Sequence, residues 1–527
     1  MTSSYAIAEQ IEQLKKSVVR INCIDREFNF SEPYRIGADT GVCGSGFFVN
    51  QTALFGHVKF PGRRVILTNS HVVQGAATKT VRILYPGTGK SYLTATVAWL
   101  CESIDFAVIL INPEVQEHWF VEEMTAVDFL ETRENLEFIE LPIRGNGETV
   151  FALGYPADHE DAVATVGCIA CRSDDMYQLA MSINGGNSGG CVVYDGRVLG
   201  IATSSLCEAE GISYGVPVLQ IASFLQQWLG DAPIGSLLIP PSFGVSLRPA
   251  TRAFFKSIDS AATGAIVHHL QPNGSFAKAG LKDGDVLTGL STLHGGTKHH
   301  FSVDNHGLIT VPWSLAKIDL QNLDIVLFCD ANKTKIHFLS KGKTNKRKKS
   351  QAYASKTRKA PILVTRKAVP TLVPFYDEIK HVLFGGIVLQ QLSKNHASMM
   401  KEEGRRADPR FLFKLLETDG DEQMVVVSHV YRQSVASDSE TFEDLTILKS
   451  INGTDIKTIE EAETLLASAV KNRVAEPFIH LATDRHDDIV FDLFELIAQE
   501  QMFLSSIPHH PRDTLLNVKT RSKRRRR

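Results

Sequence analysis

The segment Gly186-Asn187-Ser188-Gly189-Gly190 places one serine between glycines, and its surroundings decide the fold. Short runs rich in Val, Ile, Thr and aromatic residues precede and follow it, at Met176–Ser182 and Gly190–Tyr194. Such runs, bounded by Gly, Pro, Asn and Asp, are typical of β-strands. The segment also satisfies Gly-x-Ser-x-Gly, the strand-to-helix turn of α/β-hydrolases, but no alternating strands and helices surround it. We therefore expect an all-β setting for Ser188.

Working outward, candidate strands form two groups of six between residues 15 and 230. The first group comprises Val18–Asn22, Gly44–Val49, Arg64–Thr68, Thr80–Leu84, Leu93–Leu100 and Phe106–Ile111. The second comprises Val150–Leu153, Val163–Ala170, Met176–Ser182, Gly190–Tyr194, Val198–Thr203 and Ser213–Val216. The polar stretch Asn112–Gly147 divides them, and the apolar spacing of Val218–Trp228 predicts a closing helix. The pattern predicts two antiparallel β-barrels or sandwiches.

Three segments of this region supply the parts of a nucleophilic serine site. A serine hydroxyl needs a histidine to accept its proton and a carboxylate to orient that histidine. His71 follows a buried strand, and Asp105 precedes an apolar one, where an unpaired acid would be costly. The glycines allow positive φ, so N–H groups of Gly186, Asn187 and Ser188 can point at a developing oxyanion. We expect His71, Asp105 and Ser188 to be catalytic.

Each of these segments taken alone has an ordinary structural interpretation. A glycine-rich run is usually a loop, a single histidine is usually structural, and an acid often ends a strand. Chain order adds information, because an α/β-hydrolase places its acid and histidine after the serine. Here the order is His71, Asp105, Ser188, on a background of strands. The combination favours catalysis.

At these residues the sequence resembles the HtrA/Deg family of trypsin-like serine proteases, and most closely its plant-type Deg members. The matching motifs are Gly44-Ser-Gly-Phe-Phe-Val, Thr68-Asn-Ser-His-Val-Val, Asp105-Phe-Ala-Val, Leu153-Gly-Tyr-Pro and Gly186-Asn-Ser-Gly-Gly. The resemblance implies a mainly β chain, in which a double β-barrel protease domain at 15–230 precedes two α+β PDZ-like domains. It assigns His71 as general base, Asp105 as its orienting partner and Ser188 as nucleophile.

Residues 243–340 resemble a PDZ domain, and residues 361–500 resemble the divergent second PDZ domain of plant-type Deg proteases. Phe243-Gly244-Val245 lies where the carboxylate-binding loop belongs, so we expect peptide binding there. A packing domain with a closed groove is the alternative. Leu323–Cys329 is expected to be a late strand of the first domain, and Ile459–Val470 a helix of the second. In the relatives, the second domain serves assembly more than substrate capture.

The expected substrate specificity follows from Ser182, which stands where trypsin-like enzymes that cut after Lys or Arg carry an acid. The expected pocket walls Ile183, Ile201 and Thr203 are apolar or small, so we expect uncharged, small or aliphatic residues before the cleaved bond. Cys191 departs from the family pattern and suggests sensitivity to thiol reagents.

Composition narrows the setting and the partners. Net charge is only −3, and no apolar run approaches the ~20 residues of a membrane span. Eight cysteines without a leading signal sequence predict a soluble intracellular protein with reduced thiols, outside membranes. A basic linker at 341–360 and a basic tail at 501–527 resemble nuclear-import signals, which favours the nucleus or nucleolus over the cytoplasm. A solvated charge run is the alternative, and nucleic-acid binding would be weak.

We therefore expect an ATP-independent endopeptidase that acts on unfolded or regulatory proteins without a cofactor or metal. The resemblance implies a homo-oligomer, a trimer or a multiple of trimers. One alternative is a PDZ-based chaperone or binding protein with a non-catalytic protease scaffold. Another is a basic adaptor that associates with chromatin or RNA.

Overall fold

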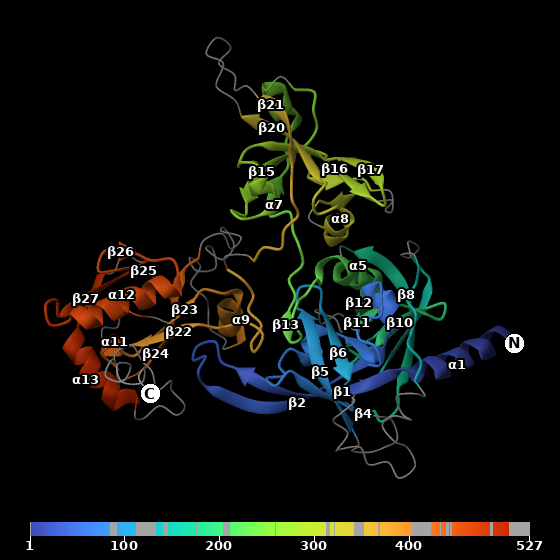
Figure 1. Ribbon diagram of the computed structural model, residues 1–527, viewed down its shortest axis with the longest axis horizontal. Coiled ribbons are helices and arrows are strands. Elements are labelled where there is room, and N and C mark those ends of the chain that lie inside the picture. Colours follow the sequence, from blue (N-terminus) through green and yellow to red (C-terminus); the bar gives the residue numbers. More distant parts are fainter. Residues whose placement is uncertain are drawn as a thin grey trace. The chain divides into compact units, whose positions relative to one another are not determined.

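The computed structural model describes residues 2–84, 92–111, 133–140, 146–156, 159–173, 176–203, 211–258, 260–311, 317–320, 322–341, 353–366, 369–402, 423–432, 434–438, 442, 445–484 and 488–504. The chain forms two compact units (Figure 1). The first contains residues 1–25 and 41–365, and the second contains 26–40 and 366–527. None of the described helices is long and apolar enough to cross a membrane.

Six strands of the first unit close into a barrel, as expected. Their order is β5-β4-β1-β2-β3-β6, and β5 also pairs with β6. The strands are β1 (Val18–Phe28), β2 (Ile36–Phe48), β3 (Val65–Thr68), β4 (Thr80–Leu84), β5 (Tyr92–Cys101) and β6 (Phe106–Ile111). Every residue of β6 is buried, in keeping with its unbroken apolar sequence. A further strand, β13 (Ser236–Leu237), adds parallel to β5.

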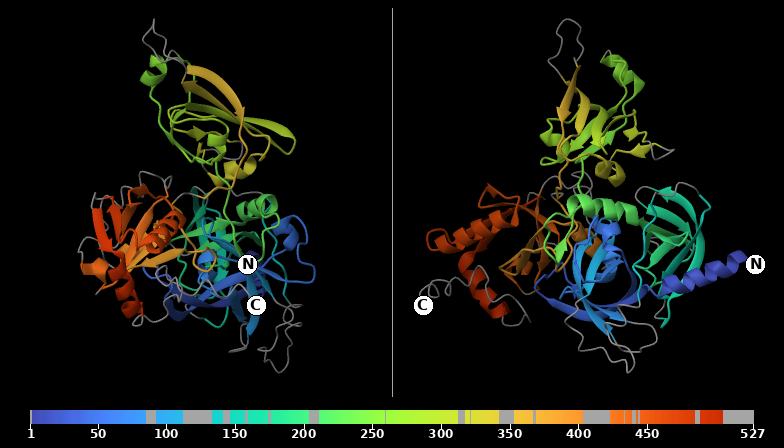
Figure 2. Two further views of the ribbon diagram at one scale, coloured as in Figure 1. Left: turned by 60° about the vertical axis from the view of Figure 1, so that its left-hand side comes forward. Right: turned by 45° about the vertical axis from the view of Figure 1, so that its right-hand side comes forward.

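The second barrel is closed by the next six strands, in the order β10-β11-β12-β9-β8-β7. They are β7 (Thr149–Gly154), β8 (Val163–Ser173), β9 (Met176–Ala180), β10 (Cys191–Tyr194), β11 (Arg197–Thr203) and β12 (Ile212–Pro217). Helix α5 (Val218–Trp228) then lies along the barrels, in green in Figure 2. Its Phe224 ring lies 6.1 Å from that of Phe106, so α5 contacts the first barrel as well. The other helices of this region are α1 (Thr2–Lys15) and the short helices α2 (Gln51–Phe55) and α3 (Ser70–Val73).

The remainder of the first unit is a small domain that mixes strands and helices. Its sheet has the order β14-β15-β16-β20-β21, with β17 paired to β16. The elements are β14 (Val245–Arg248), α6 (Arg252–Ser257), β15 (Ala265–Leu270), α7 (Ser275–Lys278), β16 (Val286–His294), β17 (Thr297–Ser302), β18 (Leu308–Ile309), β19 (Ile318–Asp319), α8 (Leu323–Phe328), β20 (Lys335–Lys341) and β21 (Tyr353–Lys359).

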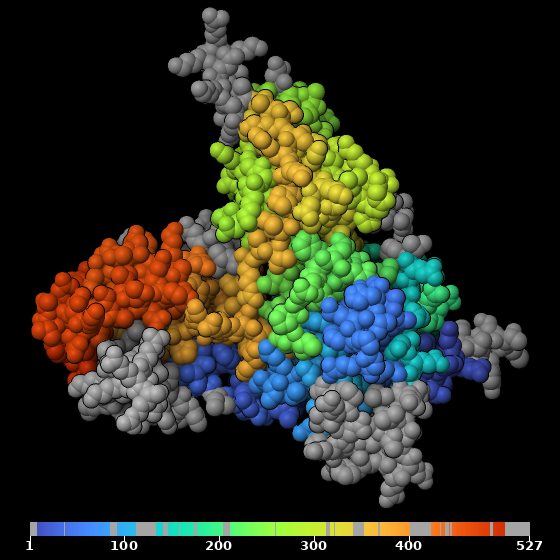
Figure 3. Space-filling view, in the orientation of Figure 1, coloured from blue at the N-terminus to red at the C-terminus, as the bar shows by residue number. Residues whose placement is uncertain are grey.

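Two expectations for this domain were wrong. The apolar run Leu323–Cys329 is not a strand, because its residues 323–328 form helix α8, which the Asn322 side chain caps by accepting from the Asp324 amide at 2.9 Å. Because most of this helix is buried, its unbroken apolar sequence cannot be told from that of a buried strand. The expected basic linker 341–360 contains β21, which pairs with β20 and can be followed at the surface in Figure 3. The first basic cluster, Lys346–Lys349, lies outside the described residues.

The second unit contains a six-stranded path, β22-β23-β24-β25-β27-β28, with β26 paired to β25. Helix α12 shows a complete capping box at Thr458 and Glu461, which confirms the expected helix. The elements are β22 (His381–Phe384), β23 (Ile387–Gln391), α9 (Lys394–Glu402), β24 (Val425–Val430), α11 (Val435–Asp438), β25 (Thr446–Ile451), β26 (Thr454–Asp455), α12 (Ile459–Asn472), β27 (Phe478–Thr483), β28 (Asp488–Asp492) and α13 (Leu493–Leu504).

Residues 26–40, which are the turn between β1 and β2 together with the adjoining strand ends, belong to this second unit, although we expected all of 15–230 to form one domain. The Gln390 side chain donates to the carbonyl of Phe30 at 2.5 Å, and the Ser428 hydroxyl donates to that of Ser31 at 3.1 Å. Tyr431 contacts Tyr34, whose pKa is raised by burial. The turn is therefore an integral part of the second unit.

Candidate active site

His71 and Asp105 meet at the ends of two paired strands. His71 lies in α3, just after β3, and Asp105 immediately precedes β6. The Nδ1 atom of His71 lies 3.0 Å from each carboxylate oxygen of Asp105. The histidine side chain is 40% exposed, whereas that of the aspartate is 19% exposed. The carboxylate therefore fixes one ring nitrogen while the ring keeps an accessible side.

Further donors fix the carboxylate itself. The Ser70 hydroxyl donates to Oδ1 of Asp105 at 2.8 Å, and the Thr203 hydroxyl donates to Oδ2 at 3.2 Å. The Asn69 side chain donates to the backbone carbonyl of Asp105 at 2.9 Å. Asp105 has φ of +59°, in a left-handed region that Asp tolerates better than most residues. Backbone strain of this kind is concentrated at functional sites.

The loop that carries Ser188 is fixed by its glycines. Gly186 and Gly189 have φ of +93° and +89°. A Cβ atom at Gly189 would lie 2.1 Å from the Ser45 carbonyl oxygen and 2.2 Å from the Thr68 hydroxyl, so no other residue fits. Ser188 itself is 6% exposed. The glycines therefore allow a tight turn that presses against the first barrel.

The loop of Ser188 lies close to the segment that carries His71. A Cβ atom at Gly44 would lie 2.5 Å from Val72, the neighbour of His71, and 3.2 Å from the carbonyl oxygen of Ser188. The loop from the second barrel thus lies beside α3 of the first. The Thr203 contact brings Asp105 against the second barrel as well.

One predicted oxyanion donor is already occupied. The backbone N–H of Asn187 donates to the Asn184 carbonyl at 3.1 Å, so the expectation that it faces a substrate was wrong. This bond closes the tight turn of the loop and could not be predicted from the local residue pattern. Gly186 and Ser188 remain the candidate donors.

The predicted pocket residues are only partly brought together. Ser182 is exposed and Ile183 is half-buried. Ile201 is 0% exposed in the core, so it cannot line a pocket, and this expectation was wrong. Every residue of β11 from Val198 to Thr203 is buried, so an apolar sequence there does not distinguish a core residue from a pocket wall. Thr203 contacts Asp105, and residues 204–210, which follow it, are outside the described part.

A family model of the trypsin-like peptidase domain matches residues 44–201, and a PDZ domain model matches residues 373–508. The chain carries a trypsin-like protease domain. The two matches cover the strands that supply His71, Asp105 and Ser188, and most of the second unit. They support a PDZ-bearing serine protease over a non-catalytic binding protein.

Curated relatives confirm the resemblance of the protease to the HtrA/Deg group. The mitochondrial protease Do-like 3 of Arabidopsis thaliana is 24% identical over 473 residues, which cover 86% of this chain and 73% of the relative. A DegP-like periplasmic serine endoprotease of Rhizobium meliloti is 28% identical over 47% of this chain and 45% of its own length. The Do-like HtrA of Bacillus subtilis is 26% identical over 54% of this chain and 64% of its own length. This chain therefore spans about half to three quarters of these relatives.

Solved structures of the same type also match the protease. The serine endoprotease of Yersinia pestis is 17% identical with a TM-score of 0.42, over 68% of this chain and 97% of that one. The HtrA-type protease AlgW with a decapeptide is 16% identical with a TM-score of 0.43, over 68% and 98%.

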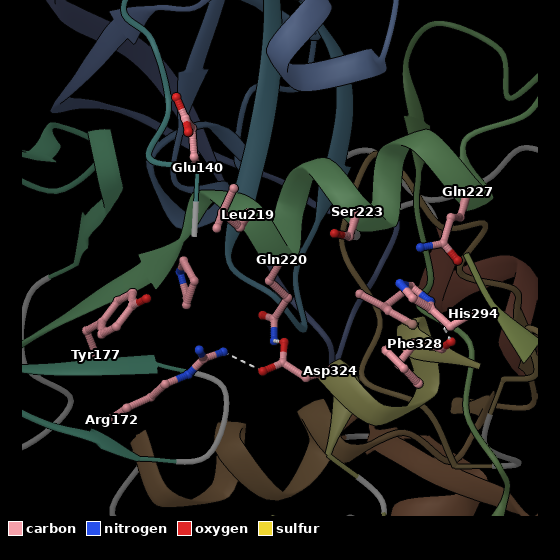
Figure 4. Close-up of a pocket in the computed structure, with 12 residues that line it drawn as sticks. Glu140, Arg172, Tyr177, Leu219, Gln220, Ser223, Gln227, His294, Asp324 and Phe328 are labelled. Atoms are coloured by element: carbon pink, nitrogen blue, oxygen red, sulfur yellow. Dashed lines mark hydrogen bonds and ion pairs between the residues drawn. The ribbon is translucent and has the colours of Figure 1, made fainter. Parts of the chain in front are cut away.

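A cleft of about 320 Å³ adjoins the protease's second barrel. It is lined by residues of β8, α5 and α8, among them Arg172, Gln220 and Asp324 (Figure 4). Arg172 forms an ion pair with Asp324, and the Gln220 side chain donates to the same carboxylate at 3.0 Å. These contacts join α8 of the small domain to the end of β8 and the start of α5.

The seven cysteines that the structure describes are free thiols. In the described ranges, no group of three or more His, Cys, Asp or Glu could hold a metal ion. Cys168 and Cys171 are free thiols on β8. Cys191 is 0% exposed, and burial raises the pKa of its thiol to about 12. Burial therefore argues against the expected sensitivity of this cysteine to thiol reagents.

We accordingly predict that Cys191 resists alkylation in the native protease. A pKa raised from 9.0 to about 12 lowers its thiolate fraction at neutral pH by about a thousandfold. Iodoacetamide treatment followed by peptide mapping should label Cys191 only after denaturation. Half-buried Cys43 is the internal control and should be labelled in the native protein. Native labelling of Cys191 that proceeds with loss of activity would contradict this prediction.

Proposed function

We propose that this chain is an ATP-independent serine endopeptidase that cleaves unfolded or regulatory protein segments. The observation that carries the proposal is the His71–Asp105 pair, in which both carboxylate oxygens lie 3.0 Å from Nδ1. The loop that carries Ser188, with glycines at positive φ on both sides of the serine, lies beside this pair. His71 takes the hydroxyl proton of Ser188 and later delivers it to the leaving amine. Asp105 keeps Nδ1 protonated and stabilises the imidazolium.

The oxyanion of the tetrahedral intermediate is bound by the backbone N–H groups of Gly186 and Ser188 in this proposal. Preorganised donors of this kind are usually the largest electrostatic contribution to acyl transfer. The pocket for the substrate residue before the cleaved bond is assigned to Ser182 and Ile183, which carry no negative charge. Cleavage after small or aliphatic residues is the consequence, and such residues are exposed in unfolded proteins.

The direct test combines labelling with mapping of the cleavage sites. Wild-type protein is incubated with a fluorophosphonate probe, and the labelled peptide is identified by mass spectrometry. Label at Ser188 and casein cleavage after Val, Ala, Ile or Leu are expected. Intact casein together with unlabelled Ser188 would exclude the endopeptidase. Cleavage chiefly after Lys or Arg would exclude only the proposed specificity.

The two PDZ-like domains differ in the strand edge that a peptide would use. In the first domain β14 pairs with β15 and stands at the edge of the described sheet, next to Phe243 and Gly244. In the second, the corresponding strand β23 pairs with β22 on one side and β24 on the other. Val382 and Phe384 of β22 pack into the same core as α12. Strand β22 therefore fills the position that an added peptide strand would take.

We predict that a hydrophobic C-terminal peptide binds only the first domain. A peptide with a benzophenone near its C-terminus should crosslink to residues 243–248 and leave 381–391 unlabelled. The same peptide with an amidated C-terminus is the control and should label at least tenfold less, because the loop binds a carboxylate. Crosslinks concentrated in β23 would contradict the prediction.

Assembly and location are part of the same proposal. We keep the trimer, or a multiple of trimers, as the expected state, and analytical ultracentrifugation tests it. We also keep the nuclear or nucleolar location, for which Lys356–Lys359, exposed on β21, and the tail at 501–527 are the candidate signals. Relocation of a fluorescent fusion after deletion of 521–527 and neutralisation of Lys356, Arg358 and Lys359 tests it. Nucleic-acid binding remains a weak expectation.

A further inference from the structure

Ser45, near the end of β2, bonds to several parts of the candidate site at once. Its backbone N–H donates to the carbonyl of Ser188 at 2.8 Å, and its hydroxyl donates to the carbonyl of Gly186 at 2.6 Å. The same hydroxyl accepts from the backbone N–H of Tyr155 at 2.9 Å. Its own carbonyl accepts from the Thr68 hydroxyl at 2.6 Å. Ser45 thus contacts both residues that carry the candidate oxyanion donors.

The bond to Gly186 matters because a glycine has no side chain to restrict its rotation. At φ of +93° Gly186 has several other conformations within reach, and some would turn its N–H away from a substrate. A hydroxyl that binds the carbonyl of this residue removes that freedom. The bond also joins two barrels, since Ser45 lies in the first and the loop in the second.

The surroundings leave the Ser45 hydroxyl little room to move. Ser45 is 0% exposed. A Cβ atom at Gly154 would lie 2.9 Å from its Oγ and 2.8 Å from Oδ1 of Asn187, so the backbone there approaches both side chains closely. The hydroxyl is therefore held in one orientation, in which it accepts a hydrogen bond from the Tyr155 N–H and donates one to the Gly186 carbonyl.

We propose that Ser45 is a positioning residue that keeps the Gly186 and Ser188 N–H groups aimed at the oxyanion. It does not touch the substrate and acts through the loop. The proposal rests on the endopeptidase function above. In this proposal full activity requires Ser45 in addition to His71, Asp105 and Ser188.

The test is Ser45→Ala, which deletes one oxygen atom. We expect kcat on a peptide substrate to fall roughly ten- to fiftyfold, because the hydroxyl loses both of its hydrogen bonds, the one to the Gly186 carbonyl and the one from the Tyr155 N–H. KM and the midpoint of the kcat/KM pH profile should stay at the wild-type values, since neither substrate groove nor His71 is altered. The affinity of the variant for a peptide aldehyde, which forms an oxyanion-like hemiacetal, should fall by the same factor as kcat. A product peptide with a free carboxylate should lose less than threefold.

Matched variants separate positioning from general damage. Ser17→Ala removes a hydroxyl from a serine that is 1% exposed and lies just before β1, and should keep wild-type kcat. Ser45→Thr keeps the hydroxyl and should recover most of kcat, with folding of each variant checked by thermal melting. Equal losses of aldehyde and product affinity, or a wild-type kcat for Ser45→Ala, would overturn the proposal. Absence of turnover in the wild-type protein would instead count against the endopeptidase function.

Discussion

Replacement of Ser188 by alanine is expected to lower kcat on casein or a peptide substrate by about 10⁵- to 10⁶-fold, as loss of a serine nucleophile does in other proteases. The acyl-enzyme cannot form without its hydroxyl. Stability should change little, because only one oxygen is removed from a side chain that is 6% exposed. The residual rate would come from substrate binding and the oxyanion donors alone.

The measurement is initial-rate kinetics on purified variants, together with fluorophosphonate labelling. Ser17→Ala is a suitable control, since it removes the hydroxyl of another buried serine at a distance in sequence from the loop. A Ser188→Ala protein with turnover within tenfold of wild type would show that another group performs the chemistry.

Asp105→Asn is expected to lower kcat by about 10⁴-fold while the protein remains folded. The amide is nearly the same size as the carboxylate, so packing survives. The new NH₂ group donates a hydrogen bond and cannot accept one from Nδ1–H, so His71 takes the wrong tautomer for accepting the Ser188 proton. The hydroxyls of Ser70 and Thr203, which donate to the carboxylate, lose a charged acceptor at the same time.

Ser70→Ala provides the graded comparison for Asp105→Asn. It removes one of the donors to the carboxylate and leaves the charge in place, so a fall of about tenfold or less is expected. Steady-state kinetics of both variants measure the difference. If kcat of Asp105→Asn fell by less than a hundredfold, the carboxylate would not be the group that orients the histidine.

Much of the barrel architecture could be predicted from local sequence. Phe106–Ile111 and Thr80–Leu84 were predicted with the observed bounds, because apolar runs and alternation follow directly from burial on a sheet. Helix α5 also has the predicted bounds, since its apolar spacing and Gly230 are local signals. The pairing of His71 with Asp105 was expected because Asp105 precedes an apolar strand, where a carboxylate without a partner is costly.

The rest depended on contacts that no local pattern encodes. Residues 323–328 form a helix because Asn322 caps them and their neighbours enclose them, while their apolar sequence suits either structure. The charges of β21 suggested a linker, but the backbone pairs with β20 whatever the side chains are. Ser45 and Ser70 were missed for a related reason. A small hydroxyl gains its role only from the carbonyl or carboxylate that tertiary structure brings to it.

The turn at residues 26–40 has a consequence for any experiment that divides the chain. A protease nick near residue 366 would break the chain between the two units, but residues 26–40 would remain covalently attached to the N-terminal fragment. The two pieces should therefore co-elute under native conditions and separate only in denaturant. A C-terminal fragment expressed alone would lack the segment that Gln390 and Ser428 bind, and would expose those buried groups to solvent. Fragment complementation, with the N-terminal piece supplied in trans, is the way to recover it.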